Sequence, residues 1–240
     1  MKALILNSGL GSRMGDITNT HPKCMTEIQD NETIISRQLN LLKECGITEV
    51  VMTTGYFNEV LQDYCNSLGL GMNITYVNNP KYMETNYIYS IYCAKDFLDD
   101  DIILMHGDLV FSKNVLKNVL SSVKSCMTVS STLPLPEKDF KAVIHEGKIE
   151  KVGIEFFDDA QAAQPLYKIN KDDWKVWLNN IIKFCENDNR KCYAENAFNE
   201  VSDKCSIYPL DVKNDLCSEI DNPEDLKKVS TILKNNNGCY

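Results

Sequence analysis

The chain has 240 residues, of which 43% are hydrophobic, and carries a formal net charge of −9. This length suits one sizeable α/β core, with or without a small appendage, and argues against two full domains. The acidic balance argues against a nucleic-acid partner, which needs Lys and Arg to neutralise phosphates, and no stretch approaches the roughly 20 apolar residues of a membrane helix.

The first half of the chain alternates between predicted strands and predicted helices. Apolar runs predict strands at residues 3–7, 49–53, 73–77 and 101–105. Apolar residues at helical spacing predict helices at residues 33–45, 57–68 and 87–98. This rhythm is typical of a parallel sheet with crossover helices. We therefore predict an α/β, Rossmann-like single domain whose mixed, mostly parallel sheet has helices on both faces.

The second half is less regular. We predict helices at 114–123, 172–186, 190–202 and from Pro223 onward, strands at 126–132 and 206–210, and a hairpin at 142–152. Residues 154–167 fit neither pattern clearly. Residues 1–234 are predicted to form the domain and residues 235–240 a flexible tail.

A glycine-rich loop follows the first strand. Gly9, Gly11 and Gly15 are spaced G-x-G-x-x-x-G, which fits neither the dinucleotide fingerprint nor a P-loop. The glycines alone are equally compatible with an ordinary strand-to-loop turn. Free loop amides together with Arg13 and Lys23, however, predict a phosphate site in this acidic protein.

Several polar segments should meet at the carboxyl edge of the predicted sheet, where ligands of such folds bind. They are the glycine loop, Thr54-Gly55, Asn78-Asn79-Pro80 and Gly107-Asp108. A carboxylate beside a phosphate is repulsive unless a cation lies between them, so Asp108 is predicted to bind Mg²⁺, with a turn aspartate as the alternative. Asp221 is the second candidate, although Pro223 makes it equally a candidate helix N-cap.

These motifs resemble a known family. Leu6-Asn-Ser-Gly-Leu-Gly-Ser-Arg-Met14 with His21-Pro-Lys23 is similar to the signature of nucleotidyltransferases that activate sugar 1-phosphates and alcohol phosphates. Gly107-Asp108 and Glu219-Ile-Asp221 resemble the segments that hold that family's two metal aspartates. Asn7-Ser8 and Asn86-Tyr-Ile-Tyr-Ser90 look most like bacterial CTP:phosphocholine and aminoalkylphosphonate cytidylyltransferases. Asn7-Ser8 replaces the Ala-Ala usual in sugar enzymes, which weakens a sugar assignment.

The resemblance implies a nucleotidyltransferase fold that transfers CMP from CTP to a small phosphorylated or phosphonate acceptor, with Mg²⁺ and release of pyrophosphate. Residues 1–132 would bind the nucleotide and residues 133–221 the acceptor. Lys23, Arg13 and Lys141 would be catalytic, and Mg²⁺ would lie on Asp108 and Asp221. The implied nucleotide contacts are Leu6, Asn7, Ser8, Gly9, Leu10, Gly11, Ser12, Arg13, Lys23, Thr54, Gly55, Asn86 and Gly107.

The acceptor side is less defined. Lys141 is the candidate that grips the acceptor phosphate, with a solvated surface lysine as the alternative. A trimethylammonium group would need an aromatic cage and a carboxylate, a primary amine mainly carboxylates, and a hydroxyl neither. Candidates for the cage are Phe156, Tyr167, Trp174, Trp177 and Tyr193, with Glu155 and Glu195. The helical spacing of the two tryptophans is, however, more typical of a core.

Two further classes stay open, a sugar-1-phosphate nucleotidyltransferase and a non-catalytic nucleotide-binding homologue. The ten cysteines form no C-x-x-C pair, so we expect free thiols rather than a zinc site. The start of the chain lacks the pattern of a signal peptide, which predicts a cytoplasmic protein. A homodimer is compatible with the sequence.

Overall fold

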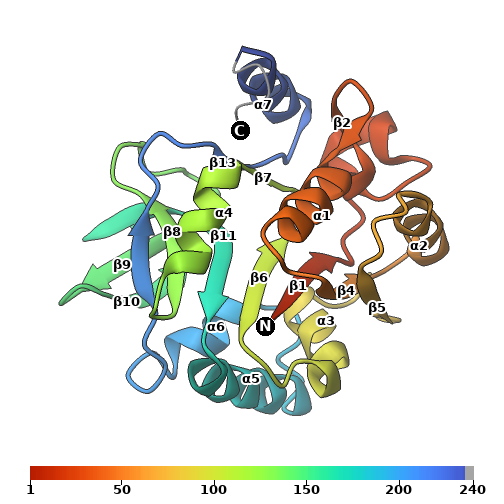
Figure 1. The fold of residues 1–240 in the computed structure, drawn as a ribbon. Helices are drawn as coiled ribbons and strands as arrows, with labels where there is room; N and C mark the ends of the chain where they lie inside the picture. The colour runs from red at the N-terminus through yellow and green to blue at the C-terminus, as the bar shows by residue number, and fades with distance from the viewer. Residues whose placement is uncertain (236–240) are drawn as a thin grey trace.

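A nine-stranded mixed sheet runs through residues 1–235, the part of the chain that the computed structural model describes (Figure 1). Its parallel part contains, in spatial order, β5 (Asn73–Asn78), β4 (Glu49–Thr54), β1 (Lys2–Asn7) and β6 (Ile102–His106). The mixed sheet with parallel central strands confirms the predicted α/β class.

The second half of the chain extends this sheet through one long antiparallel strand, β11 (Ala160–Ile169). It pairs with β6 near its end, with β8 (Cys126–Ser130) through its length, and with β9 (Lys141–His145) at its start. β10 (Lys148–Gly153) and β12 (Tyr208–Asp211) complete the edges. β11 includes much of the segment at 154–167, which fitted neither pattern in the sequence. The strand was not predicted because Pro165 and a register shift interrupt its alternation.

Helices cover both faces of the sheet, as predicted. Alternate residues of β1 explain this: Ala3 and Ile5 pack toward one side, Leu4 and Leu6 toward the other. The first side meets α1 (Ile34–Glu44), α2 (Asn58–Ser67) and α4 (Lys113–Ser121). The second side meets α3 (Tyr87–Ala94), α5 (Lys171–Glu186) and α6 (Ala194–Asn199).

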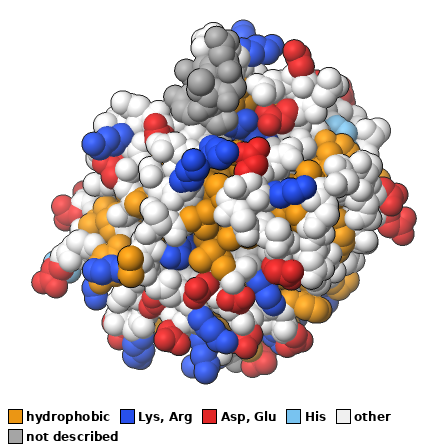
Figure 2. Space-filling view, viewed as in Figure 1, with side chains coloured by type: hydrophobic (Ala, Val, Ile, Leu, Met, Phe, Trp, Pro, Cys, Tyr) orange, Lys and Arg blue, Asp and Glu red, His pale blue; other side chains and the backbone are white. Residues whose placement is uncertain are grey.

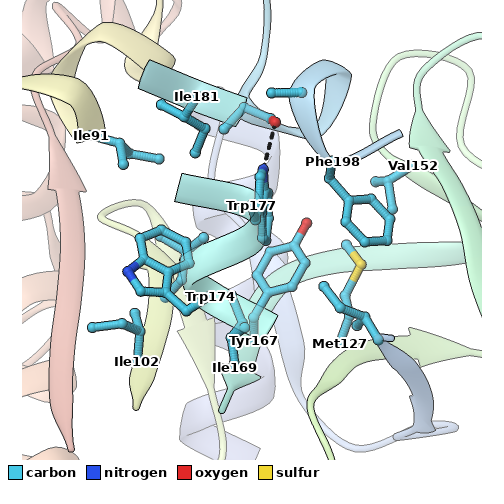
Figure 3. Close-up of a cluster of buried hydrophobic side chains, with 14 of the residues drawn as sticks. Ile91, Ile102, Met127, Val152, Tyr167, Ile169, Trp174, Trp177, Ile181 and Phe198 are labelled. Atoms are coloured by element: carbon cyan, nitrogen blue, oxygen red, sulfur yellow. Dashed lines mark hydrogen bonds between the residues drawn. The ribbon is translucent and has the colours of Figure 1, made fainter. Parts of the chain in front are cut away.

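Trp174 and Trp177 belong to the second of these cores (Figure 3). Both are almost fully buried, and their indole N–H groups donate to the carbonyls of Leu98 (3.0 Å) and Ala194 (2.9 Å). The core interpretation of the two tryptophans is therefore confirmed, and neither can form part of a ligand cage.

A smaller apolar cluster packs the end of the glycine loop against the last helix. The last helix, α7 (Pro223–Asn235), contributes Val229 and Leu233, which are buried in a cluster with Met14 and Ile220. Met14 belongs to the loop and Ile220 precedes Asp221, so this cluster ties the two candidate segments to one helix.

Several short elements were not predicted. They are the strands β2 (Glu27–Gln29), β3 (Glu32–Thr33), β7 (Leu109–Phe111) and β13 (Cys217–Glu219), and the 3₁₀ turns η1 (Ser12–Thr18), η2 (Lys23–Met25) and η3 (Lys95–Phe97). The expected helix at 190–202 is limited to α6. Of the expected tail, only Asn235 is described, as the end of α7, and residues 236–240 lie outside the described part.

The nine cysteines within residues 1–235 are free. None of the helices described combines the length and apolar character needed to cross a bilayer. Figure 2 shows basic and acidic side chains interspersed over the face viewed, rather than gathered into one broad basic field.

Candidate active site

The carboxyl ends of β1, β4 and β6 touch at one point of the sheet edge. Asn7 lies opposite Thr54, and Leu6 lies opposite His106. Gly107 follows β6 and donates its N–H to the carbonyl of Leu6 (3.0 Å). A Cβ on Gly107 would lie 1.6 Å from Oδ1 of Asn7, so only glycine fits where these two strand ends meet.

The glycine loop then passes directly over Lys23. Gly11 has a left-handed φ of 67°, and a Cβ there would approach within 2.9 Å of Cβ of Lys23. η1 begins at the next residue and carries Arg13. The loop therefore brings the two predicted cations to the same side of the sheet edge.

Lys23 joins the two predicted metal aspartates. Its ammonium pairs with Oδ2 of Asp108 and with Oδ1 of Asp221 (2.8 Å). Nη1 of Arg13 pairs with the other oxygen of Asp221 (3.0 Å). The Lys23 side chain is 14% exposed and that of Arg13 is 68% exposed. Lys23 thus provides a fixed positive charge, whereas Arg13 is free to turn toward a ligand.

A strand pair explains how Asp221 reaches Asp108. β13 runs antiparallel to β7, which starts immediately after Asp108, and Ile220 donates its N–H to the carbonyl of Asp108 (3.0 Å). The N-cap role considered for Asp221 falls instead to Asn222, whose Oδ1 accepts from two main-chain N–H groups at the start of α7. The Asp221 carboxylate is consequently available to the cations.

The charges of this cluster stabilise one another. Burial alone would lower the pKa of Lys23, but Asp108 and Asp221 outweigh it and the net pKa is raised. Burial alone would raise the pKa of Asp108, but Lys23 and His106 outweigh it and the net pKa is lowered. Lys23 is therefore an ammonium and Asp108 a carboxylate at neutral pH.

A first cavity of about 290 Å³ opens over this cluster. It is lined by Leu6, Asn7, Gly9, Leu10, Gly11, Ser12, Arg13, Pro22, Lys23, Cys24, Gly107, Asp108 and Asp221. Most of the residues predicted to contact nucleotide are in this set. Inside it, Asn7 has a buried Nδ2 that makes no hydrogen bond within the described residues. Such an unpaired donor is suited to a ligand oxygen.

A second cavity of about 340 Å³ shares Arg13, Asp108 and Asp221 with the first. Its other lining residues are Asn86, Tyr87, His106, Lys138, Asp139, Phe140, Ile154, Tyr193 and Glu219. The rings of Tyr87, Phe140 and Tyr193 line this cavity and pack against one another. The ring centroids lie 5.1 Å apart for Phe140 and Tyr193 and 5.8 Å apart for Tyr87 and Tyr193. The lining of this cavity therefore combines aromatic rings with charged groups.

A third cavity of about 180 Å³ lies between the first two. It is lined by Leu6, Ser8, Gly9, Asn79, Tyr82, Thr85, Asn86, Tyr87, Ser90, His106 and Asp108. Asp108 is shared by all three cavities. A group bound at Asp108 would consequently contact ligands on every side.

His106 and Glu219 form an ion pair at the floor of the second cavity. Nδ1 of His106 lies 2.9 Å from Oε1 of Glu219. Burial would lower the pKa of His106, but Glu219 outweighs it and raises the pKa to about 8. Burial and the charge of Asp108 raise the pKa of Glu219. This pair supplies polar groups close to the aspartates.

Two features of Asp108 fit a divalent cation. Its Oδ1 is buried without a hydrogen-bond partner among the described residues. Ligand atoms of His106, Asp108 and Glu219 all lie within 4.8 Å of one another, and Asp221 is held next to Asp108 through Lys23. Carboxylate oxygens are the ligands that Mg²⁺ prefers, so the donor set suits this ion.

Several predicted residues lie outside the cavities. Thr54 is fully buried and donates to Oδ1 of Asn58 (2.6 Å), and Gly55 packs against the Ser8 carbonyl. Glu155 is exposed and does not line the three cavities. Lys141 is fully buried, and its ammonium donates to the carbonyls at 136 (2.6 Å) and 139 (3.1 Å).

Two further acceptor candidates lie behind the second cavity rather than in it. Tyr167 and Glu195 are each 1% exposed, and the Tyr167 hydroxyl donates to Oε1 of Glu195 (2.8 Å). Of the predicted acceptor residues, only Tyr193 lines that cavity. Phe156 is half-buried and likewise does not line it.

Other lining residues were not singled out from the sequence as site residues: Tyr87, His106, Lys138, Asp139, Phe140 and Glu219. Most of them adjoin residues that were: Tyr87 follows Asn86, His106 precedes Gly107-Asp108, and Phe140 precedes Lys141. The signal in the sequence that could have identified these lining residues is therefore their position next to a motif.

Comparisons with known proteins give the family and the fold. A family model described as the MobA-like NTP transferase domain matches residues 3–134. CTP:phosphoglutamine cytidylyltransferase of Campylobacter jejuni is 34% identical over 128 residues, covering 51% of this chain and 49% of that protein. The chain thus spans about half the length of that relative.

Choline-phosphate cytidylyltransferase of Streptococcus pneumoniae is 26% identical over an alignment of 246 residues, covering 99% of this chain and 100% of the relative. A solved structure of CTP:phosphocholine cytidylyltransferase from Streptococcus pneumoniae superposes with a TM-score of 0.80 at 22% identity. That match covers 97% of this chain and 98% of the other, and shows that the two share a fold.

Proposed function

The chain belongs to the MobA-like NTP transferase family, and from that premise we propose that it is a Mg²⁺-dependent cytidylyltransferase. It would transfer CMP from CTP to a small phosphorylated or phosphonate alcohol or amine and release pyrophosphate. The printed activities of the relatives, which are cytidylyltransferases for phosphoglutamine and choline phosphate, support CTP and an acceptor of this kind.

One observation carries the proposal. Lys23 bridges Asp108 and Asp221 at the point where the first two cavities meet, and Arg13 pairs with the same Asp221. A transfer between two phosphorus-bearing substrates needs its cations at their junction, because negative charge accumulates there. A protein that only bound nucleotide would not need this cluster to face a second cavity.

The first cavity is the proposed triphosphate site. Loop amides from Gly9 to Ser12 and the exposed guanidinium of Arg13 would hold the β- and γ-phosphates, and Lys23 would neutralise the α-phosphoryl group. An oxygen of the acceptor's phosphate or phosphonate, held in the second cavity, would attack the α-phosphorus while the bond to pyrophosphate breaks. The chain's main contribution is to align the two substrates and offset their charge.

Asp108 and Asp221 would hold the Mg²⁺ ion, since they are the carboxylates shared by the first two cavities and Asp108 has a buried oxygen without a hydrogen-bond partner among the described residues. When bound, the ion would neutralise phosphate oxygens of both substrates. Lys23 would then exchange part of its contact with the aspartates for contact with phosphate.

The test is pyrophosphate release from CTP, ATP, GTP or UTP with phosphocholine, phosphoethanolamine, 2-aminoethylphosphonate or 2-hydroxyethylphosphonate, with and without Mg²⁺. We expect CTP- and Mg²⁺-dependent turnover, and a loss of about 10²–10³-fold in Lys23→Ala, the usual effect of removing one donor to developing charge. Lys117→Ala, on the exposed side of α4, is the matched control. Wild-type rates in Lys23→Ala, or no turnover with any pair, would disprove the assignment.

A further inference from the structure

The loop at 131–140, which connects β8 to β9, forms one side of the second cavity. Both of its ends are held in place. At the start, the Ser131 hydroxyl donates to a carboxylate of β12 (2.6 Å), and at the end the carbonyl of Phe140 accepts an N–H from β11 (3.0 Å). The loop residues that line the cavity are Lys138, Asp139 and Phe140.

The tip of this loop is held by Lys141, the first residue of β9. Its buried ammonium donates to the carbonyls of Pro136 (2.6 Å) and Asp139 (3.1 Å), and it lies 4.3 Å from the centre of the Phe157 ring. Burial lowers the pKa of Lys141, as expected of an ammonium removed from water. The two carbonyls stand on either side of Lys138 in the chain, so Lys141 fixes the main chain that carries Lys138.

The same tip lies beside the junction of the first two cavities. Burial, and then the charges of Asp221 and Asp225, raise the pKa of Asp139, while Arg13 opposes this rise. Charges act on one another in this way only over short distances, because water and salt screen longer ones. Asp221 and Arg13 line both cavities, so the residue next to Lys138 is close to the place where the two substrates would meet.

Lys138 differs from the other basic residues of the second cavity because it has no charged partner. Its side chain is exposed, and its ammonium forms no ion pair within residues 1–235. Arg13, in contrast, pairs with Asp221, and His106 pairs with Glu219. An unpaired ammonium on a fixed stretch of main chain is available to an incoming anion.

We infer that Lys138 binds the phosphate or phosphonate group of the acceptor, and that Lys141 is a positioning residue that acts through Lys138. An anionic group that enters the second cavity meets four carboxylates, so it needs a cation that is not already paired with one of them. Lys138 meets this need, whereas the buried Lys141 holds the loop. The inference rests on the proposed function for the identity of the acceptor, but it can be measured by binding alone.

The experiment is calorimetric titration of the full chain, with Mg²⁺ and α,β-methylene-CTP present to fill the first cavity. The probes are phosphocholine, phosphoethanolamine, 2-aminoethylphosphonate and 2-hydroxyethylphosphonate. For each probe that the wild type binds, we expect Lys138→Ala to weaken binding by about ten- to a hundredfold, the usual effect of losing a hydrogen bond between charged groups. Lys138→Arg should retain most of the affinity, and α,β-methylene-CTP should bind Lys138→Ala within about twofold of the wild type.

Glu137→Ala is the matched control, because Glu137 is an exposed residue of the same loop that does not line the cavity. It should bind every probe like the wild type. Lys141→Met should weaken the same probes several-fold on its own but add little to Lys138→Ala, since it acts through Lys138. Additive losses in the double variant would disprove this role of Lys141.

The inference is overturned if the wild type binds none of the four probes, if Lys138→Ala binds them like the wild type, or if Lys138→Ala loses α,β-methylene-CTP to the same extent. Pyrophosphate release is scored separately. Turnover with an unchanged KM for the acceptor in Lys138→Ala would overturn this inference alone, whereas Lys138-dependent binding without turnover would disprove only the proposed function.

Discussion

The contact between β4 and the glycine loop offers a sharp test of how the site is built. A Cβ on Gly55 would lie 2.4 Å from the carbonyl oxygen of Ser8 and 3.1 Å from its carbonyl carbon. A carbon and an oxygen in close contact keep about 3.3 Å apart, so Gly55→Ala must separate the two segments by roughly 1 Å. Ser8 contributes main-chain atoms to this contact, which cannot rotate away as a side chain could.

The expected consequence is twofold. Overpacking of this kind costs about 1–3 kcal/mol of unfolding free energy. Because the displaced loop carries the phosphate contacts, a shift of this size is also expected to lower CTP turnover by up to about 10²-fold. Unfolding can be followed in denaturant through the fluorescence of the two buried tryptophans, and turnover through pyrophosphate release.

Gly9→Ala is the matched stability control. No atom lies within 4 Å of a Cβ built on Gly9, and the φ of Gly9 is outside the left-handed region. The free energy of unfolding of this variant should therefore stay within about 0.5 kcal/mol of the wild-type value. If Gly55→Ala unfolds and turns over like the wild type, the glycine loop does not depend on this close contact and the reasoning is refuted.

Two other substitutions probe the supports of the site. Asn222→Ala removes the oxygen that caps α7 and should lower the unfolding free energy by about 1 kcal/mol in denaturant titration, whereas an unchanged midpoint would show that the cap is dispensable. Lys141→Met keeps the buried stem but loses the hydrogen bonds to the carbonyls of Pro136 and Asp139, so the loop that carries Phe140 should loosen. We expect the KM for the acceptor to rise several-fold with the KM for CTP unchanged, and an equal rise in both would contradict this role.

The sequence predicts the parallel half of the fold because its signals are local. β1, β4 and β6 are short apolar runs, and the helices between them repeat apolar residues at helical spacing. β11 escapes prediction since its ten residues pair with three different strands and its alternation is broken at Pro165. β7 and β13 are three residues each and exist because they pair with each other, which no local pattern records.

The same distinction separates the two sides of the site. The nucleotide side is carried by short motifs that can be read in the sequence, and in the structure Arg13, Lys23, Asp108 and Asp221 of these motifs lie together. Thr54 and Gly55 are exceptions on that side, because the Thr54 hydroxyl donates to Asn58 and Gly55 packs against the Ser8 carbonyl.

The acceptor side depends on where long side chains point, and residue type does not determine direction. Lys141 and Glu195 carry the charges expected of an acceptor site, yet both turn inward, one to main-chain carbonyls and the other to two tyrosine hydroxyls. Burial changes what each charge can do. Lys141 can order a loop, and Glu195 can hold two tyrosine hydroxyls in place. The aromatic residues that do form the wall come from α3, from the start of β9 and from the N-cap of α6, so they become a set only when the sheet is assembled. Acceptor choice in this chain should therefore respond to substitutions behind the pocket as much as to those in it.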